Sequence, residues 1–219
     1  MAIKKNKKFW NNFYKKNLAT DKPSKFAIFI AKFLKNHDSK IVDIGCGNGR
    51  DLIFFKKKRI DIVGIDQSKN ATLLIKKKLK KMEDKKKIFN NDFVKFNYKK
   101  NIKTKFSIYS RFTWHTINKK NESIFLKKIS NLSNLEYLFI ETRSIKDDLC
   151  GVGKKLSKNE FITDHYRRFI NKIDLVKKLK KNFKIIYLKE SKGFSKFKKE
   201  DPCLIRLIAV KKSIKILKS

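Results

Sequence analysis

The spacing of hydrophobic positions predicts two amphipathic helices in the first part of the chain. In both, apolar side chains recur at the three- and four-residue intervals that place them on one face of a helix. They are Phe9, Trp10, Phe13 and Tyr14 in the first helix and Phe26, Ile30, Phe33 and Leu34 in the second. Because the first set is entirely aromatic, we expect this helix either in the core or as a flap over a pocket.

From residue 41 the pattern changes to short apolar runs that alternate with amphipathic segments. The runs have the length of buried strands and lie at residues 41–44, 61–65, 87–89, 106–109 and 137–140. The segments between them predict helices that start near Leu52 and that cover residues 71–82 and 124–132. Alternating strands and helices predict a mostly parallel sheet covered by helices on both faces.

The last third of the chain begins with a polar segment and then returns to regular elements. Residues 144–170 show no regular period, and we expect an irregular insertion over the active-site edge of the sheet. A helix at 174–182 and strands at 185–188 and 204–210 come next. About 15 residues without a helical pattern join these strands, which favours an antiparallel edge hairpin.

Length and composition fit one domain of 219 residues, with a helical segment over residues 1–38. The hydrophobic share of 41% is ordinary for a globular protein. No apolar run approaches the roughly 20 residues of a membrane span, and the basic start lacks the apolar stretch of a signal peptide. Cys46, Cys150 and Cys203 are too widely spaced to indicate disulfides or a metal site. We therefore expect a cytoplasmic protein with reduced thiols and no membrane contact.

The net charge of +38 is the strongest compositional signal, and basic surfaces attract nucleic-acid phosphates. However, 51 of the 58 basic residues are Lys, and Asn, Ile and Phe are also abundant, as A/T-rich codon usage would produce. We interpret most of the lysines as solvated helix faces, so a nucleic-acid partner is not favoured.

Arginine is scarce, and its positions are informative. Five of the seven arginines fall in or beside segments predicted at the active-site edge. They are Arg50, Arg111, Arg143, Arg167 and Arg168. Because the guanidinium group is a planar fork that Lys cannot supply, this distribution favours an anionic ligand, although chance placement of so few residues is the alternative.

A glycine-rich loop comes directly after the first predicted strand. Gly45, Gly47 and Gly49 permit a tight turn and close approach of the backbone to a ligand, beside the free N–H groups of the next helix. Asp66 ends the second strand 21 residues after Gly45, where a carboxylate accepts hydrogen bonds from ribose hydroxyls. The pairing of loop and acid predicts an adenosine-containing cofactor.

The order of residues in the loop distinguishes between possible cofactors. A dinucleotide fingerprint would place its third glycine where Arg50 stands. Asp43 lies two residues before the first glycine, where its carboxylate would repel a pyrophosphate but suits a ligand with an ammonium and a sulfonium group. This favours S-adenosylmethionine over NAD.

At these residues the chain resembles the class I methyltransferases. Val42–Asp51 is similar to their first motif, Val63–Ser68 to their second, and Asn90–Phe93 to the segment that holds the adenine. The resemblance covers about residues 40 to 140, and the wording Gly-Asn-Gly-Arg-Asp is similar to a small-molecule branch that includes tellurite-resistance and thiopurine methyltransferases.

The resemblance implies a fold and a cofactor site. The fold is a single Rossmann-like, doubly wound α/β domain with about seven strands, mostly parallel with an antiparallel last strand. The implied cofactor residues are Asp43, Gly45, Cys46, Gly47, Asn48, Gly49, Asp66, Gln67, Asp92 and Phe93. For Asp92, the capping of a turn is the simpler alternative.

The residues after the fourth and fifth strands bear on the acceptor. Tyr109–Phe112 stands where enzymes that methylate nucleic-acid amines carry Asn/Asp-Pro-Pro-aromatic, and no Pro-Cys of the carbon-5 pyrimidine enzymes occurs there. His115 and His165 are candidates to take a proton from a hydroxyl nucleophile. Candidate acceptor-binding residues are Arg111, Arg143, Arg167, Arg168 and Tyr166. Alternatively, these polar residues cap helices and hold a long loop in place.

These observations predict an enzyme that transfers a methyl group from S-adenosylmethionine to a small anionic acceptor, without a metal. The acceptor would carry a phosphate or carboxylate, in a sugar-linked molecule or a simple acid. One alternative is an RNA methyltransferase that uses the lysine-rich surface. Another is a binding protein that keeps the cofactor fold without turnover.

Overall fold

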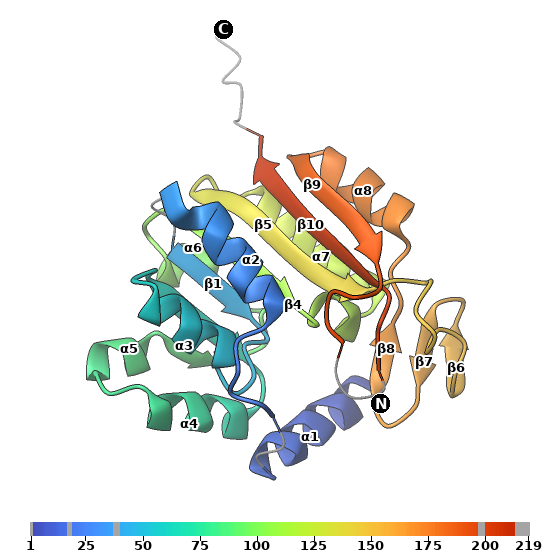
Figure 1. The fold of residues 1–219 in the computed structure, drawn as a ribbon, viewed down its shortest axis with the longest axis horizontal. Helices are drawn as coiled ribbons and strands as arrows, with labels where there is room; N and C mark the ends of the chain where they lie inside the picture. The colour runs from blue at the N-terminus through green and yellow to red at the C-terminus, as the bar shows by residue number, and fades with distance from the viewer. Residues whose placement is uncertain (1, 17–18, 37–39, 197–199, 213–219) are drawn as a thin grey trace, which may run out of the picture.

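The computed structural model describes residues 2–16, 19–36, 40–196 and 200–212. A seven-stranded sheet forms its centre, flanked by helices on both faces, and a small three-stranded sheet lies beside it (Figure 1). In chain order the strands of the large sheet are β1 (Lys40–Ile44), β2 (Ile62–Asp66), β3 (Ile88–Asn90), β4 (Phe106–Arg111), β5 (Leu135–Arg143), β9 (Phe183–Ser191) and β10 (Leu204–Lys211).

The strand order is β3-β2-β1-β4-β5-β10-β9. Neighbouring strands pair in parallel from β3 to β5, whereas β10 pairs antiparallel with both β5 and β9. The predicted doubly wound sheet with an antiparallel last strand and edge hairpin is therefore confirmed. The order reverses between β1 and β4, which is where parallel sheets of this kind bind ligands beyond the strand ends.

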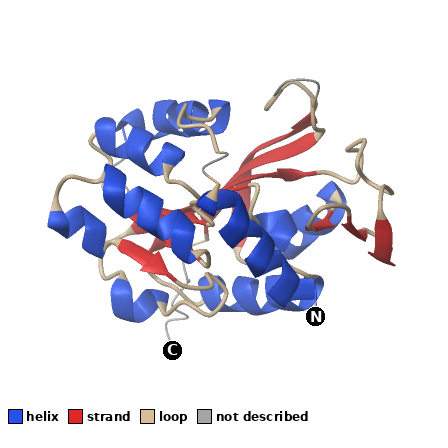
Figure 2. Ribbon diagram, turned by 90° about the horizontal axis from the view of Figure 1, so that it is seen from below, coloured by secondary structure: helices blue, strands red, loops and turns tan. Residues whose placement is uncertain are grey.

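Alternating side chains on the strands separate two hydrophobic cores. Ile41 packs in the core under α2 (Lys25–Phe33), α3 (Arg50–Lys57) and α4 (Lys69–Lys78). Val42, the next residue, packs in the core under α6 (Tyr98–Asn101), α7 (Lys119–Ser130) and α8 (Lys172–Lys180). Figures 1 and 2 show these helix layers on the two faces of the sheet. Short helical turns also occur at Leu34–Asn36 (η1), Met82–Lys86 (α5) and Trp114–Thr116 (η2).

The first helix, α1 (Ala2–Lys15), lies across the carboxyl ends of the strands, apart from both helix layers (Figure 1). Asn11 fixes it to the start of α4, because its side-chain oxygen accepts hydrogen bonds from the Ser68 hydroxyl (3.1 Å) and the Asn70 N–H (3.2 Å). The alternative of a flap over a pocket is thus the one that the structure supports. No helix in the described part of the chain is long and apolar enough to cross a membrane.

Two predicted elements were wrong in detail. The helix expected over 71–82 ends at Lys78, because Leu79 takes an extended conformation and turns into the core, while Met82 begins α5 and is 64% exposed. Residues 144–170 are not irregular but contain an antiparallel sheet of β6 (Lys154–Ser157), β7 (Glu160–Ile162) and β8 (Tyr166–Arg168). All four residues of β6 are exposed, so this strand has no buried side to leave an alternating pattern in the sequence.

Candidate active site

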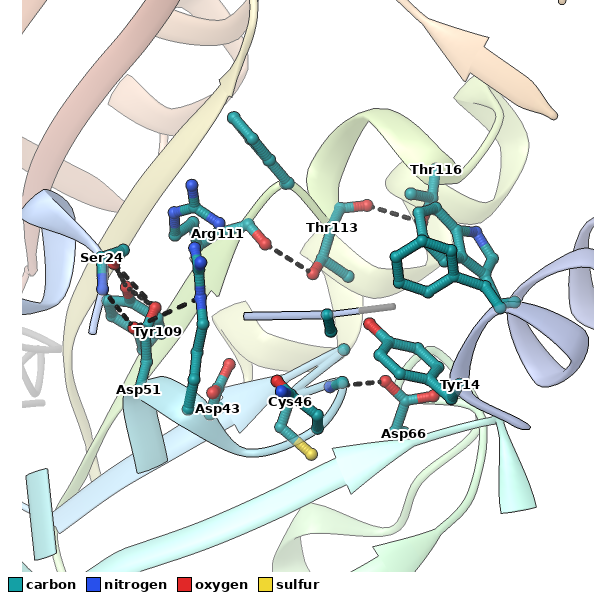
Figure 3. Close-up of a pocket in the computed structure, with 18 of the residues that line it drawn as sticks. Tyr14, Ser24, Asp43, Cys46, Asp51, Asp66, Tyr109, Arg111, Thr113 and Thr116 are labelled. Carbon is teal, nitrogen blue, oxygen red and sulfur yellow. Dashed lines mark hydrogen bonds and ion pairs between the residues drawn. The ribbon is translucent and has the colours of Figure 1, made fainter. Parts of the chain in front are cut away.

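A cavity of about 720 Å³ lies at the carboxyl ends of β1, β2, β4 and β5, beneath α1. Its size suits a small ligand rather than a single ion. Trp10, Phe13 and Tyr14 of α1 line one side, and the glycine loop after β1 lines another. Figure 3 shows that Tyr14 and Asp66 lie at one end and Ser24, Asp51, Tyr109 and Arg111 at the other, with Asp43 and Cys46 between them.

The glycine loop is shaped by left-handed backbone and by its contacts to β2. Gly45, Gly47 and Gly49 have φ angles of 68°, 56° and 78°. The N–H groups of Gly45 and Cys46 both donate to the carbonyl of Ile65, at 2.7 and 3.2 Å. This leaves Gly47 at the cavity wall, where an added side chain would meet Tyr14.

Asp66 ends β2 inside the cavity. Its Oδ2 accepts a hydrogen bond from the Gly47 N–H (2.9 Å) and its Oδ1 accepts one from the Ser68 N–H (2.8 Å). Burial raises the pKa of this carboxyl, and the two backbone hydrogen bonds oppose the shift. The carboxylate is thus fixed in orientation, with lone pairs left over for the hydroxyls of a ligand.

Asp43, near the end of β1, is the most central acid of the cavity. Burial raises its pKa well above the ordinary value, Asp51 and Asp66 raise it further, and Arg111 and Arg50 act in the opposite direction. A cationic ligand beside this carboxyl would favour its charged form. The position therefore suits the positive groups of a ligand.

The end of the cavity beyond Asp66 is formed by Gln67, Asp92 and Phe93. Asp92 also caps the next turn, because its Oδ1 accepts from the Val94 N–H at 2.9 Å. The ring of Phe93 packs edge-on against Phe125. Asp92 therefore caps a turn with one oxygen, as the alternative interpretation predicted, and also lines the cavity.

Two further loop residues complete this half of the site. Cys46 lines the cavity with a buried thiol whose pKa is raised by that burial. Asn48 lines it too, and its amide donates to the Thr20 carbonyl and to Asp21, both at 3.0 Å. These bonds hold the segment before α2 against the glycine loop.

The opposite end of the cavity carries arginines. Arg111, at the end of β4, donates from Nη2 to the Ser195 hydroxyl (2.8 Å), and its Nε lies 3.2 Å from Glu141 Oε1. Arg143, at the end of β5, makes a two-oxygen contact to Asp147 at 2.9 and 3.0 Å and donates to Glu200 at 3.2 Å. The two predicted arginines at the ends of parallel strands thus do reach one cavity.

The comparison with known proteins agrees with this geometry. Residues 41–134, which include the glycine loop, Asp66 and Asp92, match the family model of the methyltransferase domain. The seven-stranded sheet with its helices has the fold of the class I methyltransferases. No curated protein sequence matches the chain.

Solved structures resemble nearly the whole domain, at low identity. A S-adenosylmethionine-dependent methyltransferase from Clostridium acetobutylicum has a TM-score of 0.64 and 16% identity, over 86% of this chain and 92% of that one. A SAM-dependent methyltransferase from Methanosarcina mazei has a TM-score of 0.68 and 15% identity, over 84% and 97%. Magnesium protoporphyrin IX methyltransferase from Synechocystis, with bound SAM, has a TM-score of 0.57 and 13% identity, over 85% and 78%.

Both predicted proton acceptors lie outside the cavity. His115 lies in η2 and is buried against the end of β5, where its Nδ1 lies 3.2 Å from the Thr142 hydroxyl; burial, then the charge of Arg143, lowers its pKa well below the ordinary value. His165 packs against the rings of Phe9 and Trp10, with centroid distances of 4.6 and 4.8 Å. The geometry therefore assigns His115 to packing and His165 to holding α1 in place.

The other arginines predicted to bind the acceptor also lie elsewhere. Arg168 donates to the Ile117 carbonyl (2.8 Å) and with both terminal nitrogens to buried Glu122. Arg167 pairs with Asp164 and Thr163, and Tyr166 is buried within the small sheet opposite Ile162. None of the described residues 144–170 lines the cavity; β8 instead supports α1 and η2 from outside. Gly49 is likewise outside the lining, as the N-cap of α3.

Several cavity residues were missed by the sequence interpretation. Asp51 accepts hydrogen bonds from the N–H (2.7 Å) and hydroxyl (2.8 Å) of Ser24 and from the Tyr109 hydroxyl (2.8 Å). Asp51 is the last residue of the Gly-Asn-Gly-Arg-Asp motif, and Tyr109 lies at the end of a predicted strand. The sequence therefore contained a pattern from which both residues could have been assigned to the site. Tyr14 carried a signal only as part of the aromatic helix expected as a flap, and Ser24 carried none, because its segment reaches the site only through tertiary packing.

Proposed function

We propose that this protein transfers a methyl group from S-adenosylmethionine to a small anionic acceptor. One observation carries the proposal: a single cavity joins the glycine loop and Asp66 at one end to Arg111 at the other, with Asp43 between them. A cofactor and a second small molecule would therefore meet beside Asp43.

The residues of the first half fit the cofactor. Asp66 has lone pairs for the ribose hydroxyls, and Asp92 and Phe93, which both line the cavity, would hold the adenine. Asp43 offers a buried carboxylate to the ammonium and sulfonium groups. When bound, the cofactor supplies an electrophilic methyl group on sulfur.

The contribution of the chain to the reaction is positioning and exclusion of water. Displacement at the methyl carbon needs the acceptor atom in line with the sulfur–carbon bond, and a fixed geometry of this kind supplies much of the rate enhancement. The aromatic side chains Trp10, Phe13 and Tyr14 of α1 line one side of the cavity and reduce its contact with water. Neither histidine described above reaches the cavity, so proton removal is assigned to neither of them.

The acceptor class distinguishes this proposal from RNA methylation. A cavity of about 720 Å³ with arginines at one end fits a phosphate or carboxylate on a small molecule, and the sequence Gly-Asn-Gly-Arg-Asp supports a place in the small-molecule branch that includes tellurite-resistance and thiopurine methyltransferases. The lysine surface supports weak RNA binding that falls steeply with salt and has little sequence preference. We also propose a cytoplasmic location, which the free thiols support.

The experiment is a methyl-transfer screen with S-adenosylmethionine labelled on the methyl group, across phosphosugars, small carboxylic acids and bulk RNA. We expect label in a phosphosugar or acid, and none with the Asp66→Ala variant. Transfer to RNA alone, retained at physiological salt, would establish the alternative. Tight cofactor binding without transfer to any acceptor class would instead support a binding protein.

A further inference from the structure

We propose that Arg50 and Arg111 together form a subsite for an oxyanion, which binds the phosphate or carboxylate group of the acceptor. The inference rests on the proposed function and deepens it. It gives a role to Arg50, which stood among neither the implied cofactor residues nor the candidate acceptor-binding residues, and it separates Arg111 from the other arginines of the chain.

Arg50 is a largely buried cation with a weak partner. It begins α3, lines the cavity, and has a side chain that is 20% exposed. Its ion pair with Asp51 is long, at 3.8 Å from Nε to Oδ1. Asp51 already accepts three hydrogen bonds from Ser24 and Tyr109, so its oxygens are largely taken. A guanidinium in this state retains donors for a ligand.

Arg111 shares its acid with another arginine. Glu141 Oε2 accepts hydrogen bonds from both Nε and Nη2 of Arg206, while Arg111 approaches the other oxygen at 3.2 Å. Arg111 also donates to the neutral hydroxyl of Ser195, and its guanidinium lies over the ring of Phe112, 4.2 Å from the ring centroid. One buried carboxylate therefore serves two guanidinium groups, and the Ser195 hydroxyl is a partner that an anion can replace.

The two guanidinium groups influence each other. Burial lowers the pKa of Arg50, and the positive charge of Arg111 is the next largest cause. Two like charges held close in a cavity repel, and an anion between them removes the repulsion while it gains charged hydrogen bonds. An oxyanion with two or more oxygens matches two planar forks.

The charge of the cofactor strengthens this requirement. Asp43 is the acid that opposes Arg50 and Arg111 from the centre of the cavity. S-adenosylmethionine brings two positive groups and one negative group, so it would engage Asp43 and leave the arginines less compensated. The acceptor's anionic group is then expected on the Asp51 and Arg111 side, away from Asp66 (Figure 3).

Arg143 shows the contrast within the same cavity. Its guanidinium is held by two oxygens of Asp147 and by Glu200, so two carboxylates neutralise one cation. Arg206 is held on Glu141 by two bonds to one oxygen. The paired arginines fix the strand ends, whereas Arg50 and Arg111 keep capacity for a ligand.

The test is a titration with inorganic phosphate followed by 31P NMR, with and without S-adenosylhomocysteine, at moderate salt to screen the lysine surface. Arg50→Lys and Arg111→Lys conserve charge and remove only the planar fork. We expect each to weaken phosphate binding about tenfold or more, as loss of charged hydrogen bonds implies. The matched control is Arg59→Lys, which changes an exposed arginine just beyond the other end of α3, outside the cavity. Competition by acetate then shows whether a carboxylate shares the site.

The outcomes are distinguishable. Phosphate binding that is absent in the wild type, or equal in Arg50→Lys, Arg111→Lys and Arg59→Lys, overturns the subsite while the proposed function stands. A loss of S-adenosylhomocysteine affinity in Arg50→Lys with phosphate binding intact overturns it as well, because Arg50 would then hold the cofactor. If the wild type binds phosphate through both arginines but binds no cofactor, the subsite stands and the methyltransferase proposal fails. If Arg111→Lys prevents folding because it removes the contact to Glu141, the result for Arg50→Lys decides the test by itself.

Discussion

The hydroxyl of Tyr14 occupies the space into which a side chain at Gly47 would project. Tyr14 comes from α1 and Gly47 from the loop after β1, so a helix near the start of the chain reaches the centre of the cofactor site. Asp66 accepts a hydrogen bond from the N–H of the same glycine, at 2.9 Å. The helix α1, the glycine loop and the acid that we propose for the ribose therefore all meet at Gly47.

The first prediction concerns that residue. Gly47→Ala should weaken the binding of S-adenosylmethionine at least tenfold, because a methyl group at a φ of 56° is strained and overlaps Tyr14. Calorimetric titration measures the effect. Gly151→Ala is the matched control, since Gly151 also has a positive φ but has open space around it. Unchanged affinity in Gly47→Ala would show that α1 does not close on the loop in solution.

Asp66 is the second test of the cofactor site. Asp66→Ala removes the carboxylate that accepts from Gly47 and Ser68 and that we assign to the ribose, so affinity for S-adenosylhomocysteine should fall by at least tenfold. Asp61→Ala serves as the control, because Asp61 directly precedes β2 at the opposite end of the strand from Asp66 and forms ion pairs with Lys40 and Lys87. Equal binding by the Asp66 variant would remove the basis of the cofactor assignment.

Arg168 is expected to act on stability rather than on the acceptor. Arg168→Met leaves Glu122 buried with Lys178 and Trp114 but without its two-nitrogen partner, and loss of one member of a buried pair costs about 3–5 kcal/mol. Arg167→Met should cost less than about 1 kcal/mol, since its partner Asp164 is exposed. Urea unfolding separates the two. Similar stability together with a raised Michaelis constant for Arg168→Met would restore it to the acceptor site.

His165 predicts how stability depends on pH. Burial, and then the charge of Arg167, lowers its pKa to about 4, whereas an unfolded histidine has a pKa near 6.5. Between these values the unfolded chain binds more protons than the folded one, so stability is complete above about pH 6.5 and is lost as the pH falls toward 4. The contribution of His165 to the free energy of unfolding should be about 1–2 kcal/mol smaller at pH 5 than at pH 7.

Chemical unfolding at both pH values, compared with His165→Gln, isolates this contribution. The comparison with a variant is needed because His115 acts in the same direction, while the raised pKa values of Asp43 and Asp66 act in the opposite one. An identical pH dependence in the variant would mean that His165 is not buried against α1 in solution.

Local sequence was sufficient for the sheet and for the cofactor half of the site. The strands from β1 to β5 and the glycine loop are predicted by short-range patterns, because residues close together in the sequence determine burial, turn geometry and spacing in these elements. Asp43 and Asp66 lie at the ends of two strands that pair in parallel, so their meeting in one cavity is a consequence of the predicted topology. The same reasoning placed Arg111 and Arg143 together.

Local sequence was insufficient wherever function depends on what a side chain is paired with. The sequence does not distinguish Arg168 from Arg50. In the structure Arg168 is neutralised by Glu122, 46 residues away along the chain. The acid beside Arg50 is Asp51, which instead accepts hydrogen bonds from Ser24 and Tyr109. His165 also has the chemistry of a proton acceptor, yet the rings of α1 bury it away from the cavity. The sequence by itself determined the fold and which cofactor the loop suits, because backbone geometry is local. Only the tertiary structure decided which charges remain available to a ligand, because neutralisation depends on partners that are distant along the chain.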